Sequence, residues 1–232
     1  MSPSNGPAPT ILLIGASRGL GCAMAATFLQ RGWNVVGTVR GDKTMLHDLA
    51  AANAGRIAIE RLDICAPEEI EALRQRLAGR SFEMLFVNAG VTNDPRQTIA
   101  EVTSEEFTRV MVTNALSPMR VVEGLAPLVA PAGLIGLMSS GQGSIANNES
   151  GRREVYRGSK AALNMFMRSY AARSGARPMV LMAPGWVRTD MGGPEAPLTI
   201  EESVPSLVQV LLDKQGRPGL EYLDYRGRTL PW

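Results

Sequence analysis

Two side chains able to move a proton stand four residues apart in the segment YRGSK, which begins at Tyr156 and ends at Lys160. In a helix, this spacing places both side chains on one face. An ammonium group held near a phenol favours the phenolate and lowers the tyrosine pKa from its ordinary value of about 10. Such a tyrosine is suited to donate a proton to a carbonyl oxygen that is becoming an alcohol. The pair alone is a weak signal, because four tyrosines and three lysines can produce it by chance.

A second stretch, GASRGLG over residues 15–21, allows two chemistries. Gly15, Ser17 and Gly19 fit the G-x-S-x-G turn that presents a serine nucleophile in hydrolases. The same turn, which follows an apolar run and precedes a helical pattern, is also typical of a loop that binds a dinucleotide. A hydrolase needs a histidine to activate its serine, and the only histidine is His47, 30 positions after Ser17. We therefore favour dinucleotide binding, with the N-terminus of the following helix facing the pyrophosphate.

The end of the second expected strand bears on the choice of dinucleotide. Proteins that prefer NAD commonly carry an acid there, whereas this chain has Val39 followed by Arg40. Arg18 lies within the glycine turn, and guanidinium groups suit the additional phosphate of NADP through charge-assisted, forked contacts. Asp42 is expected to cap the following helix. We therefore predict NADP(H) over NAD(H), although surface roles for Arg18 and Arg40 stay open in a chain with 21 arginines.

Short apolar runs alternate with helical patterns, which predicts an α/β fold. The runs are apolar at nearly every position, as in strands of a parallel sheet covered on both faces. We predict one doubly wound (Rossmann) domain over residues 10–232, with about seven parallel strands, helices on both faces and a loose tail over residues 1–9. The expected strands are 10–14, 34–39, 56–62, 83–87, 133–139, 178–183 and 220–224, and the expected helices are 20–30, 44–52, 67–77, 103–129, 154–174 and 200–213.

Two polar stretches rich in glycine or proline, residues 140–154 and 184–197, each follow an expected strand. In an open parallel sheet, ligands bind at the carboxyl ends of the strands. We therefore expect both stretches to be active-site loops, the second a mobile substrate loop near residues 185–198. Its Trp186 and Met191 would form an apolar wall for a small carbonyl or alcohol substrate, which stays unidentified.

Composition narrows the function classes. The net charge of +2 gives no support for binding to nucleic acid or to a membrane surface. No apolar run is long enough to span a bilayer, and the opening residues lack the pattern of a secretory signal. Cys22 and Cys65 fall within apparent core elements, so we expect buried, reduced thiols of a cytoplasmic protein. A single histidine excludes a multi-histidine metal site, and no metal is predicted.

Seven segments share their order with one known family: GASRGLG (15–21), LDI (62–64), VNAG (87–90), VTNALSP (112–118), MSS (138–140), YRGSK (156–160) and PGWVRTDM (184–191). On these segments the sequence resembles the short-chain dehydrogenase/reductase family over nearly its whole length. The ending YLDYRGRTLPW and the lengthened loop before the tyrosine resemble the sniffer-like and C-factor-like carbonyl reductases of that family.

This resemblance implies an NADP(H)-dependent oxidoreductase that reduces an aldehyde or ketone to an alcohol. Tyr156 would deliver the proton to the substrate oxygen while the nicotinamide delivers hydride to the carbon. Lys160 would bind the nicotinamide ribose and lower the pKa of Tyr156. Ser140 would donate a hydrogen bond to the substrate oxygen, and Asn114 would hold a water that links Lys160 to solvent.

The choice of serine depends on the alignment of the loop before the tyrosine. Ser140 precedes Tyr156 by 16 positions, a few more than is usual, so Ser139 and Ser144 stay open as alternatives. By resemblance, Asp63 and Ile64 would border the adenine and Thr189 would contact the carboxamide. The cofactor-binding residues implied are Gly15, Ser17, Arg18, Gly19, Leu20, Gly21, Arg40, Asp63, Ile64, Asn88, Ala89, Gly90, Tyr156, Lys160, Pro184, Gly185, Val187 and Thr189.

Two alternative functions stay open. The first is an NAD-linked alcohol dehydrogenase, and the second is a non-catalytic dinucleotide-binding regulatory or signalling protein. Retention of the tyrosine, the lysine, a serine and Asn114 favours catalysis over the second. The long helices expected over 103–129 and 154–174 could pair in a homodimer, as helices of this family commonly do, although long helices are also compatible with a monomer.

Overall fold

The computed structural model describes residues 8–232, so the tail expected over residues 1–9 lies almost wholly outside the described residues. The strands are β1 (Thr10–Ile14), β2 (Asn34–Val39), β3 (Ile57–Arg61), β4 (Phe82–Val87), β5 (Val129–Met138), β6 (Pro178–Ala183) and β7 (Gly219–Asp224). The α-helices are α1 (Gly19–Gln30), α2 (Met45–Ala52), α3 (Pro67–Arg76), α4 (Ser104–Met111), α5 (Ser117–Leu125), α6 (Glu154–Arg173) and α7 (Ile200–Lys214).

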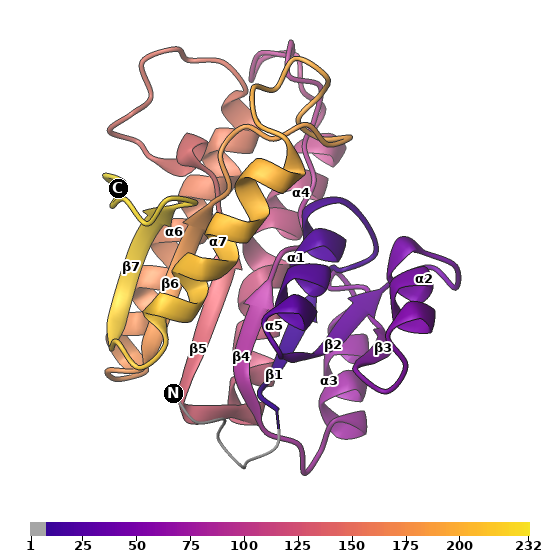
Figure 1. The fold of residues 1–232 in the computed structure, drawn as a ribbon. Helices are drawn as coiled ribbons and strands as arrows, with labels where there is room; N and C mark the ends of the chain where they lie inside the picture. The colour runs from indigo at the N-terminus through magenta and orange to yellow at the C-terminus, as the bar shows by residue number, and fades with distance from the viewer. Residues whose placement is uncertain (1–7) are drawn as a thin grey trace.

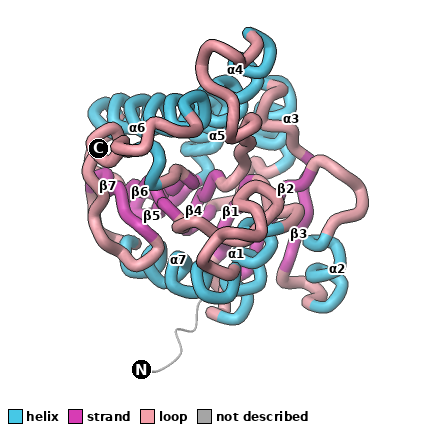
Figure 2. Tube along the Cα trace, turned by 90° about the horizontal axis from the view of Figure 1, so that it is seen from above, coloured by secondary structure: helices cyan, strands magenta, loops and turns pink. Residues whose placement is uncertain are grey.

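All of these strands belong to one parallel sheet in the order β3-β2-β1-β4-β5-β6-β7 (Figure 1). Parallel neighbours require crossover connections, and the helices supply them. Seen from above, α3, α5 and α6 cover one face of the sheet, and α1, α2 and α7 cover the other (Figure 2). The predicted doubly wound α/β fold is therefore confirmed.

The central strands are apolar at nearly every position because both faces of the sheet are covered. Successive residues of β1 enter opposite cores. Leu12 packs into the core on the side of α3, α5 and α6, and Leu13 packs into the core on the side of α1, α2 and α7. Both side chains are fully buried. Among residues 8–232, no helix combines the length and the apolar character needed to cross a membrane.

The single helix predicted over residues 103–129 is wrong in part. α4 ends at Met111, a π-helical segment (Val112–Leu116) follows, and α5 ends at Leu125. A short 3-10 turn containing Pro127 then leads into β5, which begins at Val129. Proline lacks the N–H that would continue the helix, which explains the early end. The apolar periodicity continues through the π segment and therefore does not reveal it.

Cys22 is buried as predicted, but the burial predicted for Cys65 is wrong. Cys65 lies in the turn between β3 and α3, outside the core element to which the sequence analysis assigned it. Its neighbours Leu62 and Ile64 take the inward positions of this segment, and both are buried.

The capping role predicted for Asp42 is also wrong. Thr44 is the N-cap of α2, and its backbone N–H donates to Nδ1 of His47 over 3.2 Å. Asp42 instead lies 3.3 Å from the guanidinium of Arg61, at an exposed site. Threonine and aspartate are both good N-cap residues, so composition alone did not identify the residue at which the helix begins.

Candidate active site

The glycine turn and the end of β4 meet at the point where the strand order reverses. The chain connects β1 to β2 on one side of β1, and β3 to β4 on the other side of β1. The two connections therefore diverge, which creates a crevice at the carboxyl edge of the sheet. Asn88, just after β4, donates from Nδ2 to the carbonyl oxygen of Gly15 over 2.7 Å. Gly15 has φ +85°, and a Cβ there would lie 2.9 Å from the backbone nitrogen of Ala89. A Cβ at Gly21 would lie 2.1 Å from the Gly15 oxygen, so only glycine allows α1 to pack this closely.

The N-terminus of α1 is open on the side of this crevice. Arg18 is the N-cap residue but makes no capping hydrogen bond, and the first turn contains no acidic side chain. A Cβ at Gly19 would meet no atom within 4 Å. The first N–H groups of a helix have no partner within the helix, and its dipole favours an anion there. This end of the crevice therefore fits a dinucleotide pyrophosphate. Ser17 and Leu20, the other predicted residues of the turn, are partly buried.

The residues expected at the adenosine end lie after β2 and β3. Val39 is buried, whereas Arg40 is exposed and pairs with no carboxylate in the described chain. Asp63 is partly buried, and its carboxylate accepts a hydrogen bond from the backbone N–H of Cys65 over 2.9 Å. Ile64 is buried. The guanidinium of Arg40 is thus free to meet a phosphate.

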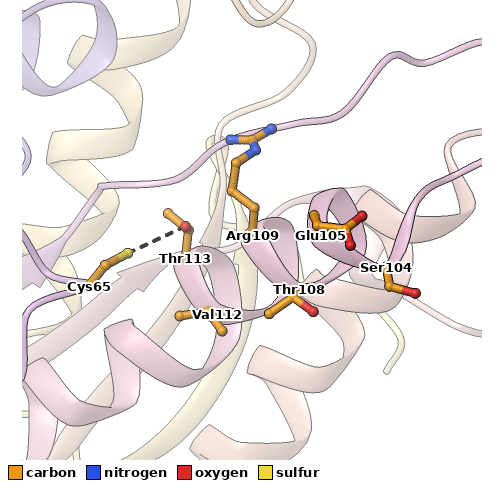
Figure 3. Close-up of a pocket in the computed structure, with 7 residues that line it drawn as sticks. All are labelled: Cys65, Ser104, Glu105, Thr108, Arg109, Val112 and Thr113. Atoms are coloured by element: carbon orange, nitrogen blue, oxygen red, sulfur yellow. Dashed lines mark hydrogen bonds between the residues drawn. The ribbon is translucent and has the colours of Figure 1, made fainter.

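A cavity of about 560 Å³ lies beside this segment (Figure 3). Cys65 and Thr113 face each other at one side of it, with Sγ and Oγ1 3.5 Å apart. Because Cys65 follows Ile64 and Thr113 precedes Asn114, the cavity adjoins two predicted site segments. The sequence analysis missed both of these lining residues. The full lining is Cys65, Ser104, Glu105, Thr108, Arg109, Val112 and Thr113.

The structure brings three of the four predicted catalytic side chains together at the start of α6. Tyr156 is 9% exposed, and the side chain of Ser140 is close enough to its hydroxyl to lower the pKa of the phenol. Lys160 is 3% exposed, and its Nζ donates to the carbonyl of Met138 over 2.9 Å. Nζ lies 5.9 Å from the centroid of the Tyr156 ring. A Cβ at Gly90 would lie 3.5 Å from this Nζ, so the glycine keeps the space beside the ammonium open.

The predicted lowering of the tyrosine pKa is wrong for this structure. Burial raises the pKa of Tyr156 above its ordinary value, and the hydrogen bond from Ser140 and the charge of Arg153 offset this only in part. Burial also lowers the pKa of Lys160 to about 8. Both effects have one cause, because removal from water disfavours the charged form of each group. The spacing of the two residues does not reveal their burial.

Asn114 lies in the π-helical segment and is fully buried. Its Oδ1 accepts from the backbone N–H of Val91 over 2.8 Å, and its Nδ2 donates to the Val91 carbonyl over 2.8 Å and to Ser159 Oγ over 2.9 Å. Ser159 in turn donates to the carbonyl of Tyr156 over 2.7 Å. Both N–H groups of the amide are used, so Asn114 holds the loop after β4 against the start of α6. The water-holding role implied by the resemblance stays a prediction.

The three candidate serines have different partners. Ser139 is buried and donates to Oδ1 of Asn164 over 2.6 Å. Ser144 is buried and lies 3.4 Å from the backbone oxygen of Trp232. Ser140 is partly exposed, accepts from the backbone N–H of Gln142 over 3.1 Å, and is the serine whose side chain acts on the pKa of Tyr156. This arrangement favours Ser140 as the serine that faces a substrate.

Tyr222 on β7 is a site residue that the sequence analysis missed. Its hydroxyl donates to the backbone carbonyl of Ser140, and its side chain is 1% exposed. Its ring lies 5.4 Å from that of Trp232, which in turn lies under the guanidinium of Arg168 at 4.6 Å. Tyr222 therefore fixes the backbone that carries the candidate serine. The only available signal was an aromatic residue with a polar group in the last strand.

Removal of this hydroxyl is expected to reduce stability. Tyr222→Phe should lower the free energy of unfolding by about 1 kcal/mol, because the Ser140 carbonyl loses one of its two donors and keeps only the backbone N–H of Gly143. Urea denaturation at neutral pH measures the change. Tyr170→Phe is the matched control, since Tyr170 is 6% exposed but its hydroxyl makes no hydrogen bond within residues 8–232. Equal losses for the two variants would contradict the role assigned to Tyr222.

The predicted substrate loop is braced by its own hydrogen bonds. Trp186 donates from Nε1 to the carbonyl of Gly192 over 2.7 Å, and Thr189 Oγ1 accepts from the N–H of Gly192 over 3.0 Å. Val187 is buried and forms a β-bridge with Leu198. The ring of Trp186 nevertheless stays 52% exposed. The loop therefore presents a fixed aromatic surface, while the Thr189 hydroxyl is engaged within the loop.

Two contacts attach this loop to the rest of the site. At its start, the Pro184 carbonyl accepts from the hydroxyl of Ser203 on α7 over 2.6 Å, and Gly185 follows with φ +85°. Further along, Asp190 forms an exposed ion pair with Arg18 of the glycine turn. The two predicted binding segments thus touch each other across the crevice.

Comparisons with known proteins agree with this geometry. A family model described as short chain dehydrogenase matches residues 9–197. A solved short-chain dehydrogenase/reductase from Burkholderia multivorans with bound NADP is 68% identical, with a TM-score of 0.95 over 97% of this chain and 100% of its own. The carbonyl reductase Sniffer of D. melanogaster is 28% identical, with a TM-score of 0.86 over the same shares. C-signal of Myxococcus xanthus is 36% identical over 154 residues, which cover 65% of this chain and 92% of its own.

These similarities confirm the resemblance that the sequence motifs indicated. The family match contains all seven motif segments, from the glycine turn to the substrate loop. The ending of the chain resembles sniffer-like and C-factor-like proteins, and the relatives include Sniffer and C-signal. The chain belongs to the short-chain dehydrogenase/reductase family.

Proposed function

We propose that this oxidoreductase uses NADP(H) to reduce an aldehyde or ketone to an alcohol, with Tyr156 as the proton donor. The observation that carries the proposal is the grouping of three side chains: Ser140 acts on the hydroxyl of Tyr156, and Lys160 lies one helical turn further along α6 with its Nζ 5.9 Å from the Tyr156 ring centroid. This group lies at the carboxyl edge of the sheet, where the open N-terminus of α1 fits a pyrophosphate. The solved relative with bound NADP and the carbonyl reductase relative support the same function.

The side chains suit reduction in the following way. When bound, the dinucleotide supplies the hydride. The hydroxyls of Ser140 and Tyr156 bind the carbonyl oxygen, and Tyr156 gives up its proton as that oxygen becomes an alcohol. The raised pKa of Tyr156 keeps the phenol protonated at neutral pH. Lys160, with a pKa of about 8, is mostly charged at neutral pH and stabilises the phenolate that remains.

A turnover assay tests this function. The protein is incubated with NADPH, and separately with NADH, against a panel of aldehydes, ketones and diones, and nicotinamide absorbance is followed. We expect oxidation of NADPH with compounds that carry an apolar group, because Trp186 and Met191 expose apolar surface on the substrate loop. Cofactor binding without turnover of any compound would contradict catalysis and favour a regulatory protein instead.

Arg40→Asp is expected to weaken NADPH binding by about 30-fold and to change NADH binding by less than about 3-fold. The guanidinium of Arg40 is exposed and has no carboxylate partner in residues 8–232, so its charge is available to the additional phosphate. Titrations followed by tryptophan fluorescence measure both dissociation constants.

The control variant for Arg40→Asp is Lys43→Asp. It makes the same change in net charge at a nearby exposed position. It should leave the ratio of the NADPH and NADH dissociation constants unchanged. Equal losses for the two nucleotides in Arg40→Asp would remove the basis for the NADP assignment and favour the NAD-linked alternative.

The homodimer stays a prediction. The elements expected to pair, α4 to α6, expose four large apolar side chains: Phe107, Leu116, Met165 and Phe166. Sedimentation equilibrium of the protein gives its mass in solution directly. A mass of one chain at all concentrations would rule the homodimer out.

A further inference from the structure

Arg153 adopts a backbone conformation that its side chain disfavours. It precedes α6 as the N-cap residue and has φ +61° and ψ +42°, in the left-handed region. Among residues 8–232 it is the only residue other than glycine with a positive φ. A Cβ is crowded in this conformation, and strain of this kind concentrates at functional sites. The position of this one side chain therefore needs an explanation.

The guanidinium of Arg153 has no hydrogen-bond or carboxylate partner in the described chain. Its Nε is buried without a hydrogen bond, and no carboxylate forms an ion pair with it. The nearby Arg157, in contrast, donates to the Arg152 carbonyl over 2.7 Å and to the Ser150 hydroxyl over 2.8 Å. The adjacent acid Glu154 is turned away and accepts from the backbone of Ile99. A half-buried cation with unused donors is unfavourable unless a ligand pairs with it.

The unpaired guanidinium faces the candidate proton donor. Its Cζ lies 5.5 Å from the centroid of the Tyr156 ring. The charge also reaches the Tyr156 hydroxyl, since it is the cation that acts against the rise of the tyrosine pKa. Arg153 ends the loop that carries Ser140, and its guanidinium lies over the ring of Tyr156, the side chain proposed to bind the substrate oxygen.

The dinucleotide phosphates do not account for this arginine. The open N-terminus of α1 and the exposed side chain of Arg40 provide for them at the other end of the crevice. This leaves the substrate as the source of a ligand for Arg153. A guanidinium is a planar fork of donors that matches the two oxygens of a carboxylate.

Building on the proposed function, we propose that Arg153 binds a carboxylate of the substrate. The preferred substrates are then oxo acids, which carry an aldehyde or ketone and a carboxylate in the same molecule. Trp186 and Met191 contact the apolar remainder. In this reaction the ketone carbon gains hydride from NADPH, the oxygen gains the proton of Tyr156, and the carboxylate is unchanged.

The test compares benzoylformate with its methyl ester, which differ in the negative charge. With the wild-type protein and NADPH, kcat/KM is expected to be at least about 10-fold higher for the acid. Arg153→Gly, which removes the guanidinium and suits the left-handed backbone, should lower kcat/KM about 30-fold for benzoylformate and less than about 3-fold for the ester. Arg153→Lys should retain part of the preference. Arg152→Gly, at an exposed neighbouring position, should leave both values unchanged.

Other outcomes overturn the proposal. Equal losses for acid and ester in Arg153→Gly would show that Arg153 acts on Tyr156 and does not bind a substrate anion. If no carbonyl compound is turned over, the proposed function fails, and calorimetric titration of benzoylformate into the protein, with and without NADPH, still decides the role of Arg153. Weaker binding to Arg153→Gly than to the wild type supports the anion site, and equal or absent binding refutes it.

Discussion

Tyr156→Phe is expected to lower kcat for the reduction of an aldehyde or ketone by about 1,000-fold. The substitution removes the only hydroxyl that can deliver a proton at this position and leaves the aromatic ring in place. Ser140 still binds the carbonyl oxygen but loses the neighbouring phenol hydroxyl. Because Tyr156 is buried and its ring stays, the variant should fold normally and bind NADPH with a dissociation constant within about 3-fold of the wild type. Steady-state kinetics and a fluorescence titration measure the two quantities.

Tyr222→Phe provides a matched control for this result. It also removes a buried tyrosine hydroxyl next to Ser140, but that hydroxyl bonds to the Ser140 backbone and not to its side chain. We expect a loss in kcat of about 10-fold or less, because only the position of Ser140 changes. Full turnover in Tyr156→Phe, or equal losses in the two variants, would contradict the assignment of Tyr156 as proton donor.

Much of the fold could be predicted because its signals are local. The bounds of β1, β2 and β6 match the predicted strands, since each is an apolar run covered on both faces and ended by a change of composition. The approach of Tyr156 to Lys160 follows from their spacing on one helix. That Ser140 lies near them followed from the family resemblance, because the serine precedes the tyrosine by 16 positions, most of them in an irregular loop.

The rest of the candidate site depends on contacts that no local pattern encodes. Tyr222 and Ser140 are 82 positions apart, and only the pairing of β6 with β7 brings them together. Arg153 looked like one of many surface arginines, because its left-handed backbone and its position over Tyr156 result from the path of the loop. The pKa values of the tyrosine and of Lys160 depend on burial. The sequence showed that a cation was near but not that both groups were out of water.

The burial of Lys160 links catalysis to stability. Its pKa is about 8 in the folded protein, below the 10.5 of a lysine in water. The unfolded chain therefore holds the proton more tightly, and protonation opposes folding at every pH below about 8. The penalty is full there, at about 3 kcal/mol, and disappears as pH rises from about 8 through the unfolded pKa. Activity changes in the opposite sense, since reduction should slow above about pH 8 as Lys160 loses its charge.

Lys160→Met is therefore expected to stabilise the protein at pH 7 by about 2 kcal/mol. The variant removes the protonation penalty of about 3 kcal/mol but loses about 1 kcal/mol with the hydrogen bond to the Met138 carbonyl. The gain should disappear by about pH 10.5, and kcat should fall about 100-fold. Urea denaturation across this pH range, without nucleotide, measures the first effect. Lys214→Met is the control, because Lys214 is equally buried but lies 2.6 Å from Glu221, and loss of a paired lysine should destabilise. Destabilisation by Lys160→Met at pH 7 would mean that burial of this ammonium is compensated within the fold.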